Sequence, residues 1–211
     1  MLNILCYGDS NTHGTAPMAH AEDRRRFAPA ARWPGVAQAG LGEGYHLIEE
    51  GLPGRTTVFD DPIDGAHLNG RRYLQACLES HKPLDVVVLF LGVNDLKRRF
   101  HLSAWDISTG VGALILMTKT ITAASGKASI VLAVAPPPIL CAGWLAPMFA
   151  GGDVTSQTLA PAIKAQCARQ GATFLDLAPV ASVSPVDGIH FDEANQRAIG
   201  TAIAVEIRRL T

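Results

Sequence analysis

Apolar and polar positions along the chain fall into blocks that predict strands and helices in turn. Five short apolar runs are typical of strands, at residues 2–7, 45–49, 85–91, 129–135 and 173–177. Residues 86–91 are apolar at consecutive positions, as in a parallel strand buried on both faces. Between the runs, apolar residues recur three and four positions apart and predict helices over 33–41, 69–79, 106–124, 154–170 and 192–209.

Five alternations of strand and helix predict an α/β sandwich around a parallel sheet with right-handed crossovers. The strands begin roughly every forty residues, but no sequence is repeated, which argues against a solenoid. No linker-like stretch interrupts the pattern. We therefore expect one domain over residues 1–211.

Composition narrows the class of protein. Apolar residues make up 48% of the chain and charged residues 18%, which is typical of a globular protein rather than a disordered one. Eighteen basic residues stand against nineteen acidic ones, so no basic excess indicates a nucleic-acid partner. The run Arg24-Arg25-Arg26 follows Glu22 and Asp23 and is interpreted as a solvated loop.

The chain has no sequence feature of export or membrane insertion. Its start lacks a basic region and reaches Gly8 before an apolar core could form, so no signal peptide is predicted. No apolar run approaches the ~18 residues of a membrane span, and no membrane partner is expected. The four cysteines are widely spaced, without a C-x-x-C pair, and are interpreted as reduced thiols of a cytoplasmic protein, not as disulfides or a zinc site.

Polar and glycine-containing segments follow the predicted strands at their carboxyl ends. They are residues 8–14 (GDSNTHG), 50–57 (EGLPGRTT), 92–95 (GVND) and, after a loop, 187–191 (DGIHF). Open parallel sheets bind ligands outside the carboxyl ends of their strands. We therefore expect these four loops to meet at one site.

These loops carry the groups of a serine hydrolase. Ser10 needs a base to remove its proton, and His190 is the candidate. Asp187, three residues earlier in the same turn, can fix the histidine tautomer and stabilise the imidazolium. The backbone N–H groups of Ser10 and Gly54 and the side-chain amide of Asn94 are candidate donors to the oxyanion.

Taken singly, each segment has a structural reading as well: a turn into a helix at Gly8-Asp9-Ser10, a helix cap at residues 187–190, a simple turn at 92–95. Other enzyme motifs fit less well. Thr12 stands where the G-x-S-x-G elbow of α/β-hydrolases has its second glycine. No phosphate-binding loop follows the first strand, and there is no H-E-x-x-H helix.

Together the segments resemble the four blocks of the SGNH (GDSL-type) hydrolase superfamily, with Ser10, Gly54, Asn94 and His190 at the block positions and Asp187 beside the histidine. Six further segments resemble the bacterial arylesterase/acyltransferase branch from end to end. They are Arg32-Trp33, Glu49-Glu50-Gly51-Leu52, Arg55-Thr56-Thr57, Asp60-Asp61-Pro62, Pro83-Leu84-Asp85 and residues 187–191.

The resemblance implies a flavodoxin-like three-layer α/β/α sandwich with a five-stranded parallel sheet, no metal or other cofactor, and action on small acyl esters. It also implies a homo-oligomer. Two residues depart from the usual first block: Asn11 replaces an apolar residue and His13 an aromatic one. Both are expected to line a more polar pocket, with a structural role as the alternative for His13. Trp144, Leu145, Met148 and Phe149 are candidates for its apolar wall, with core packing or a subunit contact as the alternatives.

The sequence thus predicts an esterase that hydrolyses short-chain, acetyl-type esters of aryl or simple alcohols through an acyl-enzyme. Acyl transfer to an alcohol and deacetylation of acetylated sugars are alternatives with the same triad. A flavodoxin-like binding module that has lost its chemistry is the non-enzymatic alternative.

Overall fold

Five parallel strands form one sheet in the order β2-β1-β3-β4-β5. The computed structural model describes residues 1–211. The strands are β1 (Leu2–Gly8), β2 (Tyr45–Gly51), β3 (Val86–Phe90), β4 (Ile130–Ala135) and β5 (Thr173–Asp176). All five predicted strands and their parallel pairing are confirmed.

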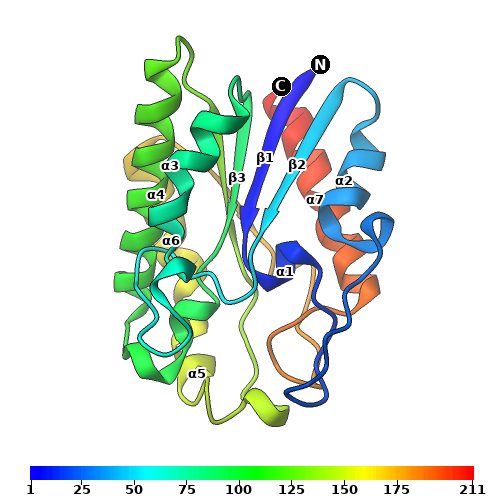
Figure 1. The fold of residues 1–211 in the computed structure, drawn as a ribbon, viewed down its shortest axis with the longest axis vertical. Coiled ribbons are helices and arrows are strands. Elements are labelled where there is room, and N and C mark those ends of the chain that lie inside the picture. Colours follow the sequence, from blue (N-terminus) through cyan, green and yellow to red (C-terminus); the bar gives the residue numbers. More distant parts are fainter.

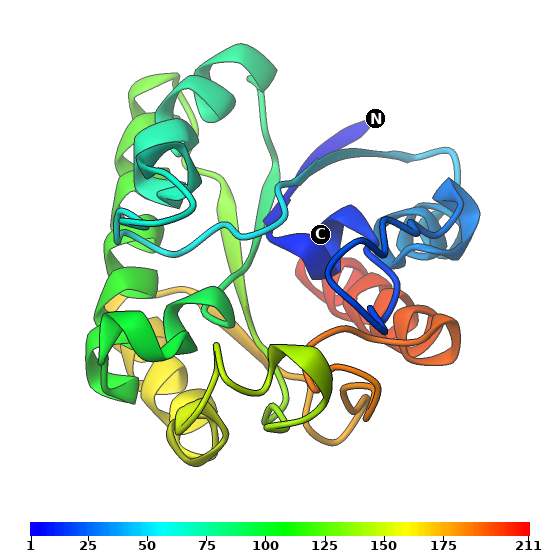
Figure 2. The ribbon, with the colours of Figure 1, turned by 60° about the horizontal axis from the view of Figure 1, so that its bottom comes forward.

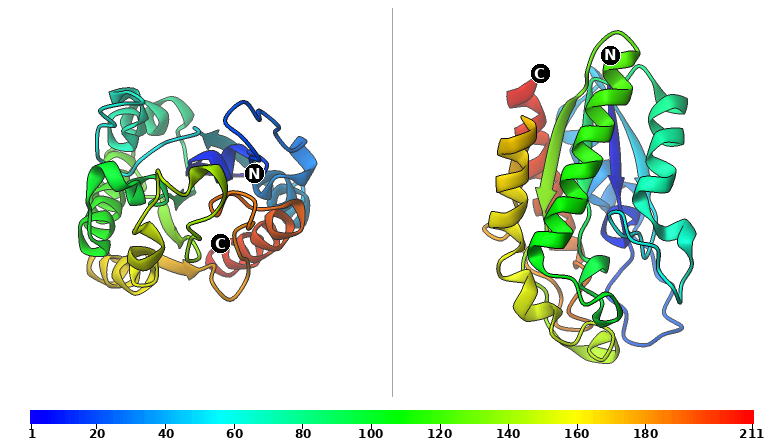
Figure 3. Two further views of the ribbon diagram at one scale, coloured as in Figure 1. Left: turned by 90° about the horizontal axis from the view of Figure 1, so that it is seen from below. Right: turned by 90° about the vertical axis from the view of Figure 1, so that its left-hand side faces the viewer.

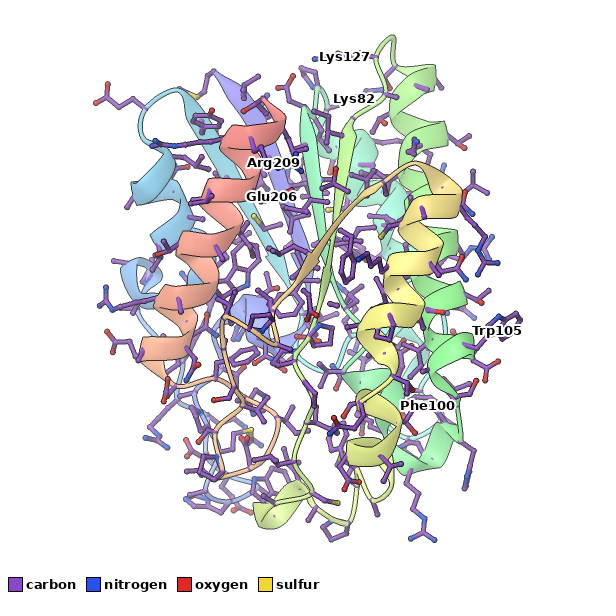
Figure 4. The ribbon with its side chains drawn as sticks, turned by 180° about the vertical axis from the view of Figure 1, so that it is seen from behind. Lys82, Phe100, Trp105, Lys127, Glu206 and Arg209 are labelled. Atoms are coloured by element: carbon purple, nitrogen blue, oxygen red, sulfur yellow. The ribbon has the colours of Figure 1, made fainter.

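Helices cover both faces of the sheet and make three layers. They are α1 (Ser10–His13), α2 (Trp33–Leu41), α3 (Gly70–His81), α4 (Ala104–Ala124), α5 (Gly152–Ser156), α6 (Leu159–Gln170) and α7 (Glu193–Leu210). Figure 1 shows α2 and α7 on one side of the sheet and α3, α4 and α6 on the other, and Figure 4 shows the same layers from behind. The predicted three-layer α/β sandwich is confirmed.

The central strand β3 supplies side chains to two cores. Val87 and Leu89 pack with the residues of α3, α4 and α6, whereas Val86, Val88 and Phe90 pack with those of α2 and α7. All five residues of the strand are buried. Successive side chains of a strand point to opposite faces, so an uninterrupted apolar run is what a sheet covered on both sides requires.

The carboxyl ends of the strands meet at one end of the molecule. That end is at the bottom of Figure 1, comes forward in Figure 2 and faces the viewer in the left panel of Figure 3, where loops far apart in sequence surround it. Lys82 and Lys127, labelled in Figure 4, mark the opposite end. The fold therefore gathers the segments singled out in the sequence.

The helix predicted over residues 154–170 is wrong in one respect: it is two helices, α5 and α6, with a break at Gln157 and Thr158. Pro161 explains the break. A proline lacks the N–H of a helix interior and its ring collides with the carbonyl four residues earlier, but it is tolerated in a first turn. It therefore sits at the third position of α6, where no intrahelical bond is lost.

The helix predicted to begin at residue 106 starts two residues earlier because Ser103 caps it. The Ser103 hydroxyl accepts from the Asp106 N–H at 3.2 Å, and the Asp106 carboxylate accepts from the Ser103 N–H at 2.9 Å. By length and composition alone α4 is also long and apolar enough to cross a membrane, with a mean hydropathy of 1.4 over 18 residues. The search for an apolar run in the sequence did not identify this helix as a candidate span. Half of that window is buried inside the fold, and α4 packs between α3 and α6 (right panel of Figure 3) as a core helix.

Candidate active site

Ser10 is the first residue of α1, directly after β1. Asp9 caps this short helix: one carboxylate oxygen accepts from the Asn11 N–H at 2.9 Å. The other oxygen of Asp9 is buried without a hydrogen-bond partner. Burial raises the pKa of Asp9 to about 6. The cap holds the Ser10 hydroxyl at the carboxyl edge of the sheet.

His190 and Asp187 reach Ser10 from the loop between β5 and α7. The distance from His190 Nε2 to Ser10 Oγ is 3.1 Å, and that from His190 Nδ1 to Asp187 Oδ2 is 2.6 Å. The Asp187 carboxylate also accepts from the backbone N–H groups of Met18 at 2.7 Å, Ile189 at 3.0 Å and His190 at 2.9 Å. Burial raises the pKa of Asp187, but the hydrogen bonds and charge of His190 outweigh it and bring that pKa below its usual value. The carboxylate is therefore ionised at neutral pH.

Gly188 gives this loop its shape. Its φ is 77°, and a Cβ at this position would lie 2.0 Å from the carbonyl oxygen of Leu140. The Leu140 N–H donates to the Gly188 carbonyl at 2.9 Å, so the loop over residues 136–152 lies directly against the turn that carries the histidine. Only glycine combines this conformation with so close an approach.

Asn94 and Gly54 lie beside the serine on two other loops. Asn94 begins a 3-10 turn after β3 (Asn94–Leu96), and one N–H of its amide donates to the Arg55 carbonyl at 3.1 Å. An amide nitrogen has two N–H donors, so the second remains for a ligand. Both residues line the same cavity as Ser10 and His190. The predicted oxyanion donors are thus close together in space.

Two buried charged groups, whose roles the sequence analysis missed, hold these loops together. Asp95 accepts from the Thr57 N–H at 3.0 and 3.1 Å and from its hydroxyl, which ties the loop after β3 to the loop after β2. Burial raises the pKa of Asp95 to about 6. The Arg55 guanidinium donates to the Gly8 carbonyl at 2.8 Å and lies 4.0 Å above the centre of the Tyr7 ring, which adds the end of β1.

A cavity of about 370 Å³ opens onto the serine. Of the predicted wall residues, Trp144, Met148 and Phe149 line it. Leu145, predicted with them, lines it as well. The polar lining residues Thr15, Asp64, His67 and Lys97 and the apolar lining residues Met18, Pro53, Leu68 and Ile189 were not predicted. Pro53 and Ile189 lie inside two of the segments that follow strands, Thr15 follows another directly, and Lys97 stands two positions after Gly-Val-Asn-Asp. Position after a strand could therefore have indicated these four.

Asn11 and His13 were predicted to line the pocket, but they do not lie in its lining. Asn11 is fully buried, and its amide donates to the Ile189 carbonyl at 3.3 Å. The His13 ring lies against Thr15, with 3.2 Å between its Nδ1 and the hydroxyl oxygen. Asn11 follows Ser10 by one helical position and therefore points about 100° away from it, into the core.

The arrangement is suited to nucleophilic attack on a carbonyl. A hydroxyl, an imidazole and a carboxylate form a hydrogen-bonded chain, and N–H donors stand beside the hydroxyl. Proton transfer from Ser10 to His190 would create an imidazolium that the Asp187 charge stabilises.

Solved structures of esterases share the whole length of this chain. The native aryl esterase of M. smegmatis is 40% identical, with 100% of both chains covered and a TM-score of 0.95. Est24, a carbohydrate acetylesterase from Sinorhizobium meliloti, is 39% identical over 100% of both chains, with a TM-score of 0.94. A putative arylesterase from Agrobacterium tumefaciens str. C58 is 35% identical over 100% of both chains, with a TM-score of 0.89.

The comparison of sequence families agrees with the structures. None of the curated proteins matches this chain. The model of the GDSL-like lipase/acylhydrolase family, however, matches residues 6–198, a span that contains every residue of the candidate triad. The resemblance stated from the motifs is therefore confirmed, and the chain belongs to the GDSL-like lipase/acylhydrolase family of carboxylic ester hydrolases.

Proposed function

We propose that this enzyme hydrolyses short-chain acyl esters through a covalent acyl-enzyme on Ser10. The observation that carries the proposal is the chain of two short contacts, 3.1 Å from Ser10 Oγ to His190 Nε2 and 2.6 Å from His190 Nδ1 to Asp187 Oδ2. A base at hydrogen-bond distance that is itself oriented by a carboxylate is the arrangement that activates a serine hydroxyl.

In the first half of the reaction, Ser10 Oγ attacks the ester carbonyl carbon as its proton passes to His190 Nε2. The N–H groups of Ser10 and Gly54 and the free N–H of Asn94 donate to the oxyanion. The tetrahedral intermediate then collapses, and His190 returns the proton to the departing alkoxide. The product alcohol leaves, and the acyl group remains on Ser10 as an ester.

In the second half, water takes the place of the alcohol. His190 removes a proton from the water, the hydroxide attacks the acyl carbonyl, and the same proton returns to Ser10 Oγ as the acid departs. An alcohol that enters in place of water would accept the acyl group by the same steps, so acyl transfer differs from hydrolysis only in the nucleophile of this half.

The cavity lining favours a small acyl group and an alcohol with polar substituents. Trp144, Met148 and Phe149 supply apolar surface, and the Asp64 carboxylate and His67 ring can exchange hydrogen bonds with hydroxyl groups. The polar side is the observation that favours an acetylated sugar as a second candidate substrate beside simple aryl acetates. The relatives named above carry both descriptions, an aryl esterase and a carbohydrate acetylesterase. A cytoplasmic location and a homo-oligomer stay predictions from the sequence.

The test of the mechanism is Ser10→Ala, assayed by release of 4-nitrophenol from 4-nitrophenyl acetate. We expect loss of nearly all turnover. Ser108→Ala is the matched control, because the Ser108 hydroxyl is buried in α4, where it donates to the Trp105 carbonyl at 2.9 Å. An organophosphonate should add one covalent group to the parent enzyme and to Ser108→Ala, and none to Ser10→Ala. Full turnover in Ser10→Ala would refute the proposal.

The test of substrate class is a panel of aryl acetates, acetylated sugars and esters of graded acyl length, run with and without a competing alcohol. Asp64→Ala should raise KM for acetylated sugars and leave KM for 4-nitrophenyl acetate nearly unchanged if the polar side binds hydroxyl groups. Equal effects on both substrates would exclude a sugar-binding role for Asp64.

A further inference from the structure

Glu50, Cys77 and His81 form a cluster of metal-ligand side chains outside the proposed active site. Glu50 comes from the end of β2, and Cys77 and His81 lie four residues apart, on one face of α3. One ligand atom of each residue lies within 4.8 Å of those of the other two. The His81 Nε2 to Glu50 Oε1 distance is 3.0 Å. Two elements that are separate in sequence thus bring a thiol, an imidazole and a carboxylate together.

We propose that these three side chains bind one Zn²⁺ ion, with water as the fourth ligand. A thiolate, an imidazole nitrogen and a carboxylate oxygen are the ligand types that zinc accepts in tetrahedral sites. Zinc bonds to these atoms are about 2.0–2.3 Å long, which separates tetrahedral ligand atoms by roughly 3.3–3.6 Å. A pair of ligand atoms 4.8 Å apart would therefore need to approach by roughly 1.2–1.5 Å, which side-chain torsions can provide.

The three side chains of the cluster differ in how exposed they are to solvent. Cys77 is only 1% exposed, so its sulfur forms the floor of the site. The side chains of His81 and Glu50 are 32% and 21% exposed, so an ion and its water can reach the sulfur from solvent between them. A site closed by protein on one side and open on the other agrees with three protein ligands and one water.

The charges around the cluster balance when the ion is bound. The Arg55 guanidinium donates to the backbone carbonyl of Glu50, so it lies next to the cluster and its charge opposes a bare cation. Glu50 and a Cys77 thiolate carry two negative charges, which Zn²⁺ neutralises, so the occupied site adds no net charge beside Arg55. Tyr7 and Tyr73 stack against that guanidinium, at 4.0 and 5.7 Å from their ring centres, and are neutral at pH 7.

Binding should release a proton. A coordinated thiol loses its proton to solvent and the sulfur lone pair forms the bond to zinc, so one proton leaves for each ion bound. The hydrogen-bond contact between Glu50 and His81 alone predicts neither that proton nor any involvement of sulfur. This difference separates a metal site from a structural contact between the two side chains.

The experiment uses the full-length protein after treatment with a chelator. Titration calorimetry with Zn²⁺ in buffers of different ionisation enthalpy measures stoichiometry and proton release, and Co²⁺ absorption reports thiolate ligation through its near-ultraviolet charge-transfer band. We expect one ion per chain, one proton released from Cys77, and a thiolate band. At a hundredfold excess of Zn²⁺ over Kd, Tm should rise by about 5–10 °C.

Cys77→Ser and His81→Gln should each weaken Zn²⁺ binding by at least roughly 100-fold, since losing a ligand costs more than losing an outer-shell partner. Matched controls are Cys167→Ser, another buried thiol, and His46→Gln, an exposed imidazole on the same strand as Glu50. His81→Gln changes a partly exposed side chain, so it keeps the test valid if Cys77→Ser fails to fold. Absence of Zn²⁺ binding, binding without the thiolate band, or equal affinity in parent and His81→Gln would each overturn the proposal.

Discussion

Asparagine in place of Asp187 should remove most of the esterase activity because it traps His190 in the wrong tautomer. The Asp187 carboxylate accepts four hydrogen bonds: Oδ1 from the N–H groups of Ile189 and His190, and Oδ2 from the Met18 N–H and His190 Nδ1. An asparagine keeps one accepting oxygen and replaces the other with an NH₂ donor. Whichever way the amide turns, its NH₂ faces at least one backbone N–H.

The two orientations differ in cost. With NH₂ at the Oδ1 position, two backbone N–H groups lose their acceptor, at about 1–3 kcal/mol each. With NH₂ at the Oδ2 position, only the Met18 N–H is lost, but the amide now donates to His190 Nδ1. The second orientation leaves one backbone N–H without an acceptor instead of two, so its free energy is lower. It forces the proton of the neutral ring onto Nε2, which then cannot accept the proton of Ser10.

The expected loss is on the order of 10⁴ in kcat, about 5.5 kcal/mol, as for a triad histidine held in the wrong tautomer. The assay is 4-nitrophenyl acetate turnover at saturating substrate, with thermal unfolding measured in parallel to report the lost backbone bond. Asp192→Asn is the matched control, because Asp192 caps α7 by accepting from the Asn195 N–H at 2.8 Å, and asparagine caps equally well. A folded Asp187→Asn enzyme within tenfold of the parent would refute the tautomer argument.

Three further outcomes follow from the site. Asn94→Ala should lower kcat by on the order of 10²- to 10³-fold with little change in KM if its free N–H serves the oxyanion; an unchanged kcat would remove Asn94 from that role. The folded-state pKa of Asp9, raised to about 6, lies above its unfolded value, so the stability that Asp9 contributes is full below about pH 4 and is lost as pH rises through 6. The free energy of unfolding of Asp9→Asn should therefore increase relative to that of the parent by up to about 3 kcal/mol between pH 4 and 8, measured by urea unfolding. A difference that does not change with pH would contradict this. His13→Ala should leave kcat/KM for acetate esters within about threefold, because the ring does not line the cavity and touches the lining only through Thr15; a tenfold loss would place it in the site after all.

The predictions from sequence were strongest where a single physical requirement determines the residue types of a whole segment. A strand covered by helices on both faces must be apolar at every position, and residues 86–90 could be assigned for that reason. The candidate triad could be predicted because the carboxyl ends of parallel strands lie at one edge of the sheet. Residues that directly follow different strands are therefore expected to lie close together in space. The break before α6 was hidden because apolar periodicity continues across it, and Pro161 is the only residue that opposes a continuous helix.

The remaining parts of the site depend on pairs of residues that no local pattern joins. Asp95 looks in sequence like the end of a turn, yet its carboxylate accepts from Thr57, 38 positions away, and fixes the distance between the two loops that carry the proposed oxyanion donors. Lys97, whose side chain is 4% exposed, is held between Asp61 and Asp64 at 3.1 and 2.9 Å, and this pairing allows a lysine in the wall of the cavity. A buried charge is stable only with its partner, and the partner comes from a different loop. The loops that carry the candidate catalytic groups are therefore positioned by polar contacts between residues far apart in sequence, and hydrophobic periodicity along the chain does not indicate such contacts.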